Sequence, residues 1–248
     1  MTGVALITGA SRGIGAATAR LAATRGIDVA VNFKTKADAA EAVVAACRAA
    51  GVRAIAVQGD VAVEADVQRM VDTTAAELGP PTVVVNNAGI LHPQARLDTY
   101  PYGRLREVFD VNVIGAFLCA REAVRRMSTR HGGGGGSIVN VSSAASYLGS
   151  PDEFIDYAAS KGAIDTLTIG LAKEVGAEGI RVNAVRPGLI DTEIHISSGE
   201  PGRAERLAAN VPMRRVGTAD EVAATIMWLA SDEAAYVNGA IVNCSGGR

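Results

Sequence analysis

The chain has 248 residues, of which 48% are hydrophobic and 20% charged, and its formal net charge is −2 at pH 7. This composition is typical of a globular chain that is long enough for one large α/β domain, and it excludes a disordered one. Lys and Arg are scattered without a basic stripe, and no apolar run approaches the ~18 residues of a membrane span, so we expect neither nucleic acid nor a membrane as partner.

Short β-branched runs alternate along the chain with Ala-rich segments of helical pattern. The runs cover residues 4–8, 28–33, 54–58, 82–87, 137–142, 181–186 and 240–244. The helical segments cover 14–24, 37–50, 63–78, 103–130, 156–178 and 219–230. Continuous apolar strands suit a parallel sheet that is covered on both faces. The alternation therefore predicts an α/β, Rossmann-type doubly wound sheet of about seven strands. No linker divides the chain, and we expect residues 1–248 to form a single domain.

The first strand runs directly into TGASRGIG, residues 8–15, which opens a helix. Glycines permit a tight turn and a close approach of pyrophosphate, and a helix N-terminus offers free N–H groups and partial positive charge. The alternative is that three glycines only close a β-to-α turn. At the first strand end of a dinucleotide fold we favour cofactor binding. We assign this role to Gly9, Ser11, Arg12, Gly13, Ile14 and Gly15.

The end of the second strand carries no acid where NAD-binding folds place one. Asn32 and Phe33 are followed by Lys34, and a carboxylate about 20 residues past the glycines usually binds the ribose hydroxyls of NAD. Without that acid a 2′-phosphate meets no repulsion, and Lys34 and Arg12 could pair with it. We therefore favour NADP(H), with NAD(H) possible. Alternatively, Lys34 and Lys36 are solvated loop charges.

The next three strand ends are polar. Asp60 and Val61 follow the third strand, and we assign both to the cofactor; alternatively, Asp60 is a helix N-cap or turn residue. NNAG, residues 86–89, follows the fourth, and its small residues suit close approach to a ribose or simply form a turn; we assign Asn87, Ala88 and Gly89 to the cofactor. Ser142 and Ser143 end the fifth strand without the G-x-S-x-G pattern of a hydrolase.

Tyr157 and Lys161 lie four positions apart in IDYAASKGAID, residues 155–165. Four positions make about one helical turn, so both side chains share a face. The pair is either an acid–base pair or a chance feature of an amphipathic helix, and the spacing alone does not decide.

Cysteines and histidines, which are common metal ligands, are dispersed along the chain. Three cysteines and three histidines lie far apart without zinc-site spacing, so we expect free thiols and no metal site. The N-terminal MTGVALITGA lacks the charged start and long apolar stretch of a signal peptide, which favours the cytoplasm.

Seven motifs, taken in order, resemble the short-chain dehydrogenase/reductase family, especially compact reductases similar to 3-oxoacyl-carrier-protein reductases and glucose dehydrogenases. The motifs are TGASRGIG, GDV, NNAG, Asn112 within FDVNVIGAF, NVSS, YAASK and NAVRPGLIDT. They span essentially the whole chain. The resemblance implies an NAD(P)-dependent enzyme acting on an alcohol or a carbonyl.

The resemblance also implies roles by position. Tyr157 would be the proton donor or acceptor, and Lys161 would lower the pKa of Tyr157 and hold the nicotinamide ribose. Asn112 would hold a water in a proton relay, and Asp60 would meet the adenine. The segment after the sixth strand would line the nicotinamide through Pro187, Gly188, Ile190 and Thr192.

The serine that binds the substrate oxygen is less certain by position. The family usually places it 13 residues before the tyrosine, which is Ala144 here. We assign the role to Ser143, with one extra residue in the loop that follows, and expect Ser142 to face the backbone. A tyrosine pKa of ~10 must fall for exchange at neutral pH, which a nearby ammonium favours.

Residues 191–216 follow the nicotinamide loop and are predicted to form a substrate lid, with 92–97 and 145–154 as other walls. Arg96, His195 and Arg203 could bind an acidic substrate or be solvated. The helices at 103–130 and 156–178 are apolar or small on most faces, so we expect contact between subunits. The resemblance implies a homotetramer.

We expect an NADPH-dependent reductase of a 3-oxoacyl group or small ketone, working with a small-molecule substrate. The alternatives are an NAD-dependent sugar or polyol dehydrogenase, and an NADP-binding regulator without turnover.

Overall fold

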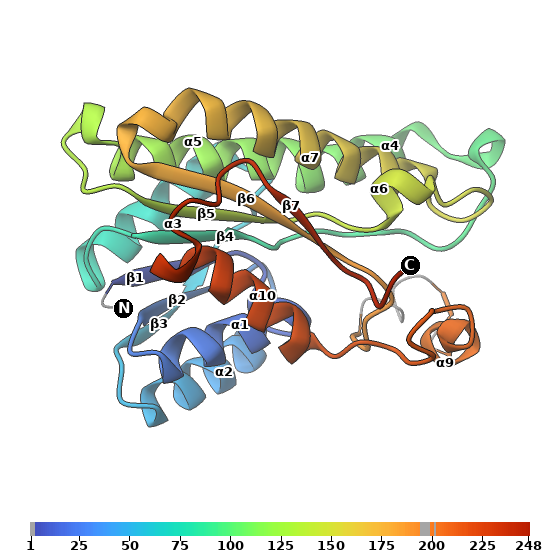
Figure 1. The fold of residues 1–248 in the computed structure, drawn as a ribbon, viewed down its shortest axis with the longest axis horizontal. Coiled ribbons are helices and arrows are strands. Elements are labelled where there is room, and N and C mark those ends of the chain that lie inside the picture. Colours follow the sequence, from blue (N-terminus) through green and yellow to red (C-terminus); the bar gives the residue numbers. More distant parts are fainter. Residues whose placement is uncertain (1–2, 194–198, 201) are drawn as a thin grey trace.

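Seven parallel strands form one sheet, and each lies within about a residue of its predicted run (Figure 1). The computed structural model describes residues 3–193, 199–200 and 202–248. The strands are β1 (Val4–Ile7), β2 (Asp28–Phe33), β3 (Ala54–Gln58), β4 (Val83–Asn86), β5 (Gly136–Val141), β6 (Ile180–Pro187) and β7 (Ile241–Cys244). Their order in the sheet is β3-β2-β1-β4-β5-β6-β7. The predicted Rossmann-type doubly wound fold is confirmed.

Helices cover both faces of this sheet. They are α1 (Gly13–Thr24), α2 (Ala37–Ala49), α3 (Glu64–Glu77), α4 (Tyr102–Phe109), α5 (Gly115–Met127), α6 (Ala145–Leu148), α7 (Ile155–Val175), α9 (Arg203–Ala208) and α10 (Ala219–Ala230). The single helix predicted over 103–130 is wrong. A π-helical turn at Asp110–Ile114 separates α4 from α5, and a 3-10 turn at Thr129–His131 follows α5.

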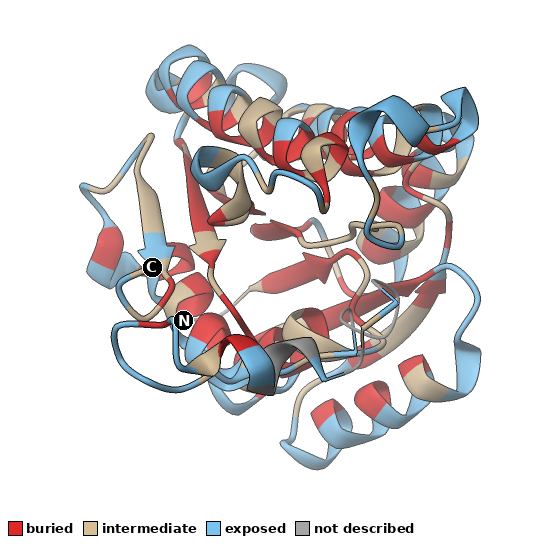
Figure 2. Cartoon of the chain, turned by 90° about the vertical axis from the view of Figure 1, so that its right-hand side faces the viewer, coloured by how far each residue is buried: buried red, intermediate tan, exposed pale blue. Residues whose placement is uncertain are grey.

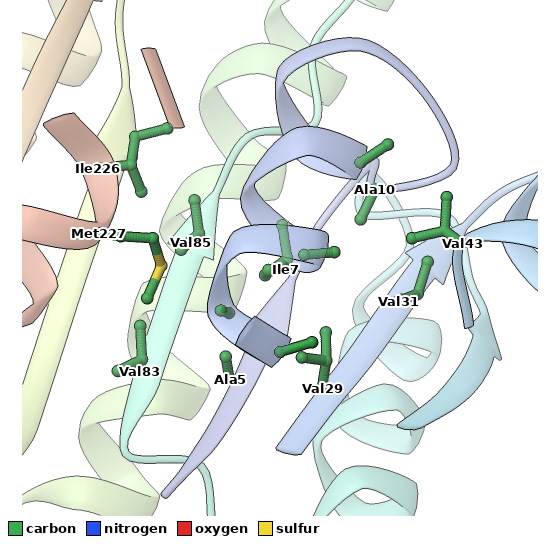
Figure 3. Packing of buried hydrophobic residues seen from close by; sticks show 14 of the residues in the cluster. Ala5, Ile7, Ala10, Val29, Val31, Val43, Val83, Val85, Ile226 and Met227 are labelled. Atoms are coloured by element: carbon green, nitrogen blue, oxygen red, sulfur yellow. The ribbon is translucent and has the colours of Figure 1, made fainter. Parts of the chain in front are cut away.

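Two apolar clusters hold the layers together. In β1, Ala5 and Ile7 face one cluster, and Leu6 faces the other. Figure 3 shows Ile226 and Met227 of α10 beside strand residues of the first cluster, which also includes α1 and α2. The second cluster joins the opposite face of the sheet to α3, α5 and α7. Both faces of each inner strand are therefore buried, while the outer sides of the helices are exposed (Figure 2).

The strand order reverses between β1 and β4, which places a crevice at the carboxyl ends of these two strands. The Thr8 main-chain N–H donates to the Val85 carbonyl at 3.0 Å, and the Thr8 hydroxyl accepts from the Asn87 N–H at 3.0 Å. The two strand ends are thus fixed side by side. Among the described residues, no helix is long and apolar enough to cross a membrane, and no group of three His, Cys, Asp or Glu could hold a metal ion.

Candidate active site

A cavity of about 760 Å³ opens at the carboxyl ends of the strands. This volume is within the usual range for cofactor and ligand pockets. The predicted site residues that line it are Gly9, Ser11, Arg12, Gly13, Ile14, Asn32, Phe33, Lys34, Asp60, Val61, Asn87, Ala88, Gly89, Ser143, Tyr157, Lys161, Pro187, Gly188, Ile190 and Thr192. Two predicted residues, Gly15 and Asn112, are buried behind the wall instead.

The glycine turn leaves no room for side chains at Gly9 and Gly15. Gly9 has a φ of +61°, and a Cβ there would lie 2.9 Å from the Ala88 Cα. A Cβ on Gly15 would lie 2.6 Å from the Asn87 Nδ2, so Gly15 serves close packing rather than direct contact. No described side chain caps the N-terminus of α1, whose first-turn N–H groups are therefore free for an anion. The residues present fit the pyrophosphate of a dinucleotide.

The end of β2 is organised by Asn32 and Lys34. The buried Asn32 amide accepts from the Gly9 N–H at 3.0 Å and donates to the Gly59 carbonyl at 3.0 Å. Its side chain therefore ties the glycine turn to β3 instead of reaching for a ligand. Lys34 Nζ lies 2.7 Å from Asp60 Oδ2, which raises the Lys34 pKa through that hydrogen bond. The structure thus pairs two residues that the sequence assigns to different parts of the cofactor.

Ser142 and Ser143 point in different directions at the end of β5. The Ser142 hydroxyl is buried and donates to the Lys161 carbonyl at 3.2 Å, as expected for a backbone contact. The Ser143 hydroxyl accepts from the Ala145 N–H at 3.1 Å and also hydrogen-bonds the Tyr157 side chain. The following loop has left-handed residues at Ser150 (φ 46°) and Asp152 (φ 59°), which is consistent with the extra residue predicted there.

Tyr157 and Lys161 share one face of α7, with Lys161 Nζ 5.6 Å from the centroid of the Tyr157 ring. Burial raises the Tyr157 pKa, and the hydrogen bond with Ser143 opposes this effect. Burial also lowers the Lys161 pKa to about 8, against the charge of Asp165. Lys161 Nζ donates to the Val141 carbonyl at 2.7 Å. The lowering of the Tyr157 pKa by Lys161 stays a prediction for the cofactor-bound enzyme.

Asn112 lies in the π-helical turn between α4 and α5, a kind of insertion that often marks functional sites. Its amide accepts from the Ile90 N–H at 2.8 Å, and it donates to the Ile90 carbonyl at 2.9 Å and to the Ser160 hydroxyl at 3.0 Å. A Cβ on Gly89 would lie 3.4 Å from Asn112 Oδ1 and 3.5 Å from Lys161 Nζ. Asn112 therefore holds the cavity wall next to the lysine.

The substrate end of the cavity differs in part from the prediction. The wall predicted over 145–154 is present, through Ala145, Leu148, Ser150, Pro151, Glu153 and Phe154. The wall predicted over 92–97 is wrong, because Ile90 and Leu91 line the cavity instead. Arg96 is exposed and pairs with Asp98 at 3.1 Å. His195 and the Arg203 side chain lie outside the described residues. Sequence reasoning missed Arg248, which also lines the cavity and carries no motif.

The comparisons with known proteins decide the family. A family model described as Enoyl-(Acyl carrier protein) reductase matches residues 9–248. A short chain dehydrogenase from Burkholderia cenocepacia J2315, solved in complex with NADP, is 36% identical with a TM-score of 0.88, covering 98% of this chain and 96% of that one. The chain belongs to the short-chain dehydrogenase/reductase family. It is an NAD(P)-dependent oxidoreductase.

Two relatives in the short-chain dehydrogenase/reductase family match nearly the full length. The uncharacterized oxidoreductase YgfF of Escherichia coli (strain K12) is 52% identical over 245 residues, covering 99% of each chain. The cis-4-hydroxycyclohexanecarboxylate dehydrogenase of Sinomonas cyclohexanicum is 42% identical, covering 98% of this chain and 95% of that one.

The buried Lys161 makes stability depend on pH. Its pKa is about 8 in the folded chain, against 10.5 for an ordinary lysine, so between these values the unfolded chain binds more protons. The lysine's contribution to the free energy of unfolding therefore rises with pH across this window. We expect Lys161→Met to be more stable than the wild type at pH 7.5, with an advantage that shrinks by about 2 kcal/mol at pH 9.5.

Urea unfolding followed by circular dichroism measures this difference. Lys173→Met removes an exposed lysine from the same helix, and its stability relative to the wild type should not change between pH 7.5 and pH 9.5. An advantage for Lys161→Met that is constant, or that grows with pH, would contradict the expectation.

Proposed function

We propose that this enzyme interconverts a small ketone, or a 3-oxoacyl group, and the corresponding alcohol with NADP(H). The observation that carries the proposal is the convergence of Ser143, Tyr157 and Lys161 on one wall of the cavity that also holds the glycine turn. Two hydroxyls joined by a hydrogen bond suit a carbonyl oxygen that receives a proton. The alicyclic alcohol named for the Sinomonas relative supports a substrate of this kind.

The cofactor, when bound, supplies the hydride. The chain's own residues protonate the substrate's carbonyl oxygen and stabilise the charge that develops on it. The Tyr157 hydroxyl gives a proton to the carbonyl oxygen during reduction and takes one back during oxidation, and the Ser143 hydroxyl stabilises the charge that develops there. Lys161 holds the ribose and favours the ionised tyrosine, and Asn112 keeps a water beside Lys161 in a proton relay.

The preference for NADP(H) is supported by charge at the end of β2. Arg12, Lys34 and Lys36 line the cavity, and β2 ends at Phe33 rather than at an acid. Lys34 is 62% exposed despite its pairing with Asp60, so its ammonium remains accessible to a phosphate. The NADP complex of the Burkholderia relative agrees with this preference.

The assembly and the lid complete the proposal. Residues 1–248 are proposed to form one domain, and the lid predicted over 191–216 includes residues 194–198 and 201, which lie outside the described residues. Phe117 on α5 and Ile169 on α7 are exposed, at 47% and 41%, which supports contact between subunits through these two helices and a homotetramer. A cytoplasmic location is part of the same proposal.

The proposal is tested by a panel of ketones and alcohols with NADPH, NADH and their oxidised forms. The panel includes 3-oxoacyl thioesters, sugars, 4-oxocyclohexanecarboxylate and its methyl ester, and it follows the absorbance of the reduced nicotinamide. We expect turnover with a clear preference for NADPH. Preference for NADH with a polyol would support the NAD-dependent alternative, and tight NADPH binding without any turnover would support a regulator.

Lys34→Ala examines the cofactor preference directly. Because hydrogen bonds to charged groups contribute about 1.5–3 kcal/mol, kcat/KM for NADPH should fall about 10- to 100-fold while the value for NADH changes little. Lys173→Ala removes an exposed lysine of α7 as the control. Equal losses with both cofactors would contradict a phosphate contact.

A further inference from the structure

Arg248 lies at the substrate side of the cavity, beside the segment that follows β6. A Cβ on Gly188 would lie 2.7 Å from the Ser245 Cα, so the chain after β7 packs directly behind this segment. Three residues later the half-buried Arg248 lines the same cavity as Tyr157. Arg248, whose side chain is cationic, thus lines the cavity that contains Tyr157 and also a smaller cavity beside Met213.

A chain of contacts holds Arg248 in place. Its main-chain oxygen accepts from the Tyr147 hydroxyl at 2.5 Å and from the Ser245 hydroxyl at 2.8 Å. The guanidinium of Arg186 lies 5.2 Å from the centroid of the Tyr147 ring and binds Asp165 Oδ2 through Nε at 3.1 Å and Nη2 at 2.7 Å. Contacts that begin at α7 and pass through β6 and α6 therefore fix the main chain of Arg248.

The charge of Arg248 has no partner among the described residues, unlike that of Arg186. Four carboxylates line the same cavity, at Asp60, Glu107, Glu153 and Glu193, and Asp60 is paired with Lys34. Glu193 Oε2 would lie 3.8 Å from a Cβ on Gly13, which places it at the glycine turn. Neither Glu193 nor Glu153 forms an ion pair with Arg248 in the described part of the chain. The neighbouring wall is mainly apolar, through Leu148, Pro151 and Phe154.

We propose that Arg248 binds a carboxylate of the substrate and makes the enzyme selective for a small oxo or hydroxy acid. The proposal rests on the proposed function, and it names the substrate class of that site. A guanidinium pairs with a carboxylate through two parallel hydrogen bonds, which fixes orientation as well as affinity. The cavity of about 760 Å³ must also take the dinucleotide, so the remaining space suits a small ring or short chain.

The test compares an acid with its uncharged ester. We measure kcat/KM with NADPH for 4-oxocyclohexanecarboxylate and for its methyl ester, and take the ratio of acid to ester. Arg248→Leu should lower this ratio at least ~10-fold, because an ion-paired hydrogen bond is lost for the acid alone. Arg248→Lys should recover part of it. Arg96→Leu removes an exposed arginine outside the cavity and should leave the ratio unchanged.

Tyr147→Phe keeps the guanidinium but removes one of the two hydroxyls that hold the Arg248 main chain. It should lower the ratio less than Arg248→Leu does, mainly through KM for the acid. Equal losses for acid and ester in Arg248→Leu, or no change in the ratio, would overturn the proposal while leaving the reductase function intact.

A binding measurement separates the two proposals. With the NADP⁺-loaded protein, calorimetry should detect cyclohexanecarboxylate much more strongly than cyclohexanecarboxamide, and Arg248→Leu should abolish that difference. Binding of the acid that depends on Arg248, without turnover of any ketone, would support the carboxylate site and refute the proposed reaction. Binding that does not distinguish acid from amide would refute the carboxylate site.

Discussion

Tyr157→Phe is expected to lower kcat for ketone reduction by about 10³-fold, because general acid–base catalysis by a positioned side chain contributes 10²- to 10⁴-fold. The substitution removes only the phenolic oxygen, which is the proposed proton donor and the partner of Ser143. The ring stays in place, so cavity shape and packing are kept. Steady-state kinetics with NADPH measure the loss.

Two further measurements distinguish this loss from a folding defect. The Tyr157→Phe protein should bind NADPH with a Kd within a few-fold of the wild type and unfold at a similar urea concentration. Tyr102→Phe removes the same oxygen from a tyrosine that is 74% exposed, and it should retain normal turnover. If Tyr157→Phe kept more than a tenth of the wild-type kcat, the proposed proton transfer would be wrong.

Most of the fold was predictable because its signals are local. A parallel strand covered on both faces must be apolar at successive positions, as Val83, Val84 and Val85 are, so sequence marks it without knowledge of its neighbours. The strand ends then place the glycine turn, Ser143 and Tyr157 around one crevice. The family spacing alone points to Ala144; Ser143 is chosen by assuming one extra loop residue, and it lines the cavity together with Tyr157, while its role stays a prediction.

The features that were missed depend on contacts between distant parts of the chain. The π-helical turn around Asn112 leaves the periodicity of the segment almost unchanged, so a single helix was expected. Lys34 and Asp60 each suit a cofactor when considered alone, and only the adjacent ends of β2 and β3 pair them. Arg248 has no neighbours in sequence that suggest a pocket, because it reaches the cavity through the packing of Ser245 against Gly188.

The ion pair of Arg104 and Asp156 is another feature that sequence alone did not indicate. The side chains are 7% and 1% exposed, and Arg104 Nε lies 2.6 Å from Asp156 Oδ2. Arg104 also donates to the Pro93 carbonyl at 2.7 Å and lies 3.8 Å from the centroid of the Tyr100 ring. Asp156 accepts from the Tyr157 N–H at 2.9 Å. The pair thus joins the loop after β4 and helix α4 to the first turn of α7, next to the proposed acid.

Asp156→Asn is expected to lower the free energy of unfolding by about 3–5 kcal/mol, because removing one partner leaves a buried, uncompensated charge. Burial by itself lowers the Arg104 pKa, but the hydrogen bond and charge of Asp156 raise it above the ordinary value, so Arg104 stays charged in the wild type. Urea unfolding followed by circular dichroism gives the difference. Asp98→Asn breaks an exposed pair with Arg96 and should cost less than about 1 kcal/mol.

A double variant separates two effects of Asp156→Asn: the loss of the ion pair, and the cost of leaving the Arg104 charge buried without a partner. Arg104→Met with Asp156→Leu removes both charges and keeps apolar volume, and such replacements of buried pairs are often neutral or stabilising. We therefore expect the double variant to be more stable than Asp156→Asn, although Arg104 also loses its bond to Pro93. If the double variant were less stable than Asp156→Asn, the main contribution of the pair would be its hydrogen bonds to the surrounding chain. In either case the first turn of α7 loses its ion pair with α4. The wall around Tyr157 then becomes less ordered, so turnover should fall in both variants.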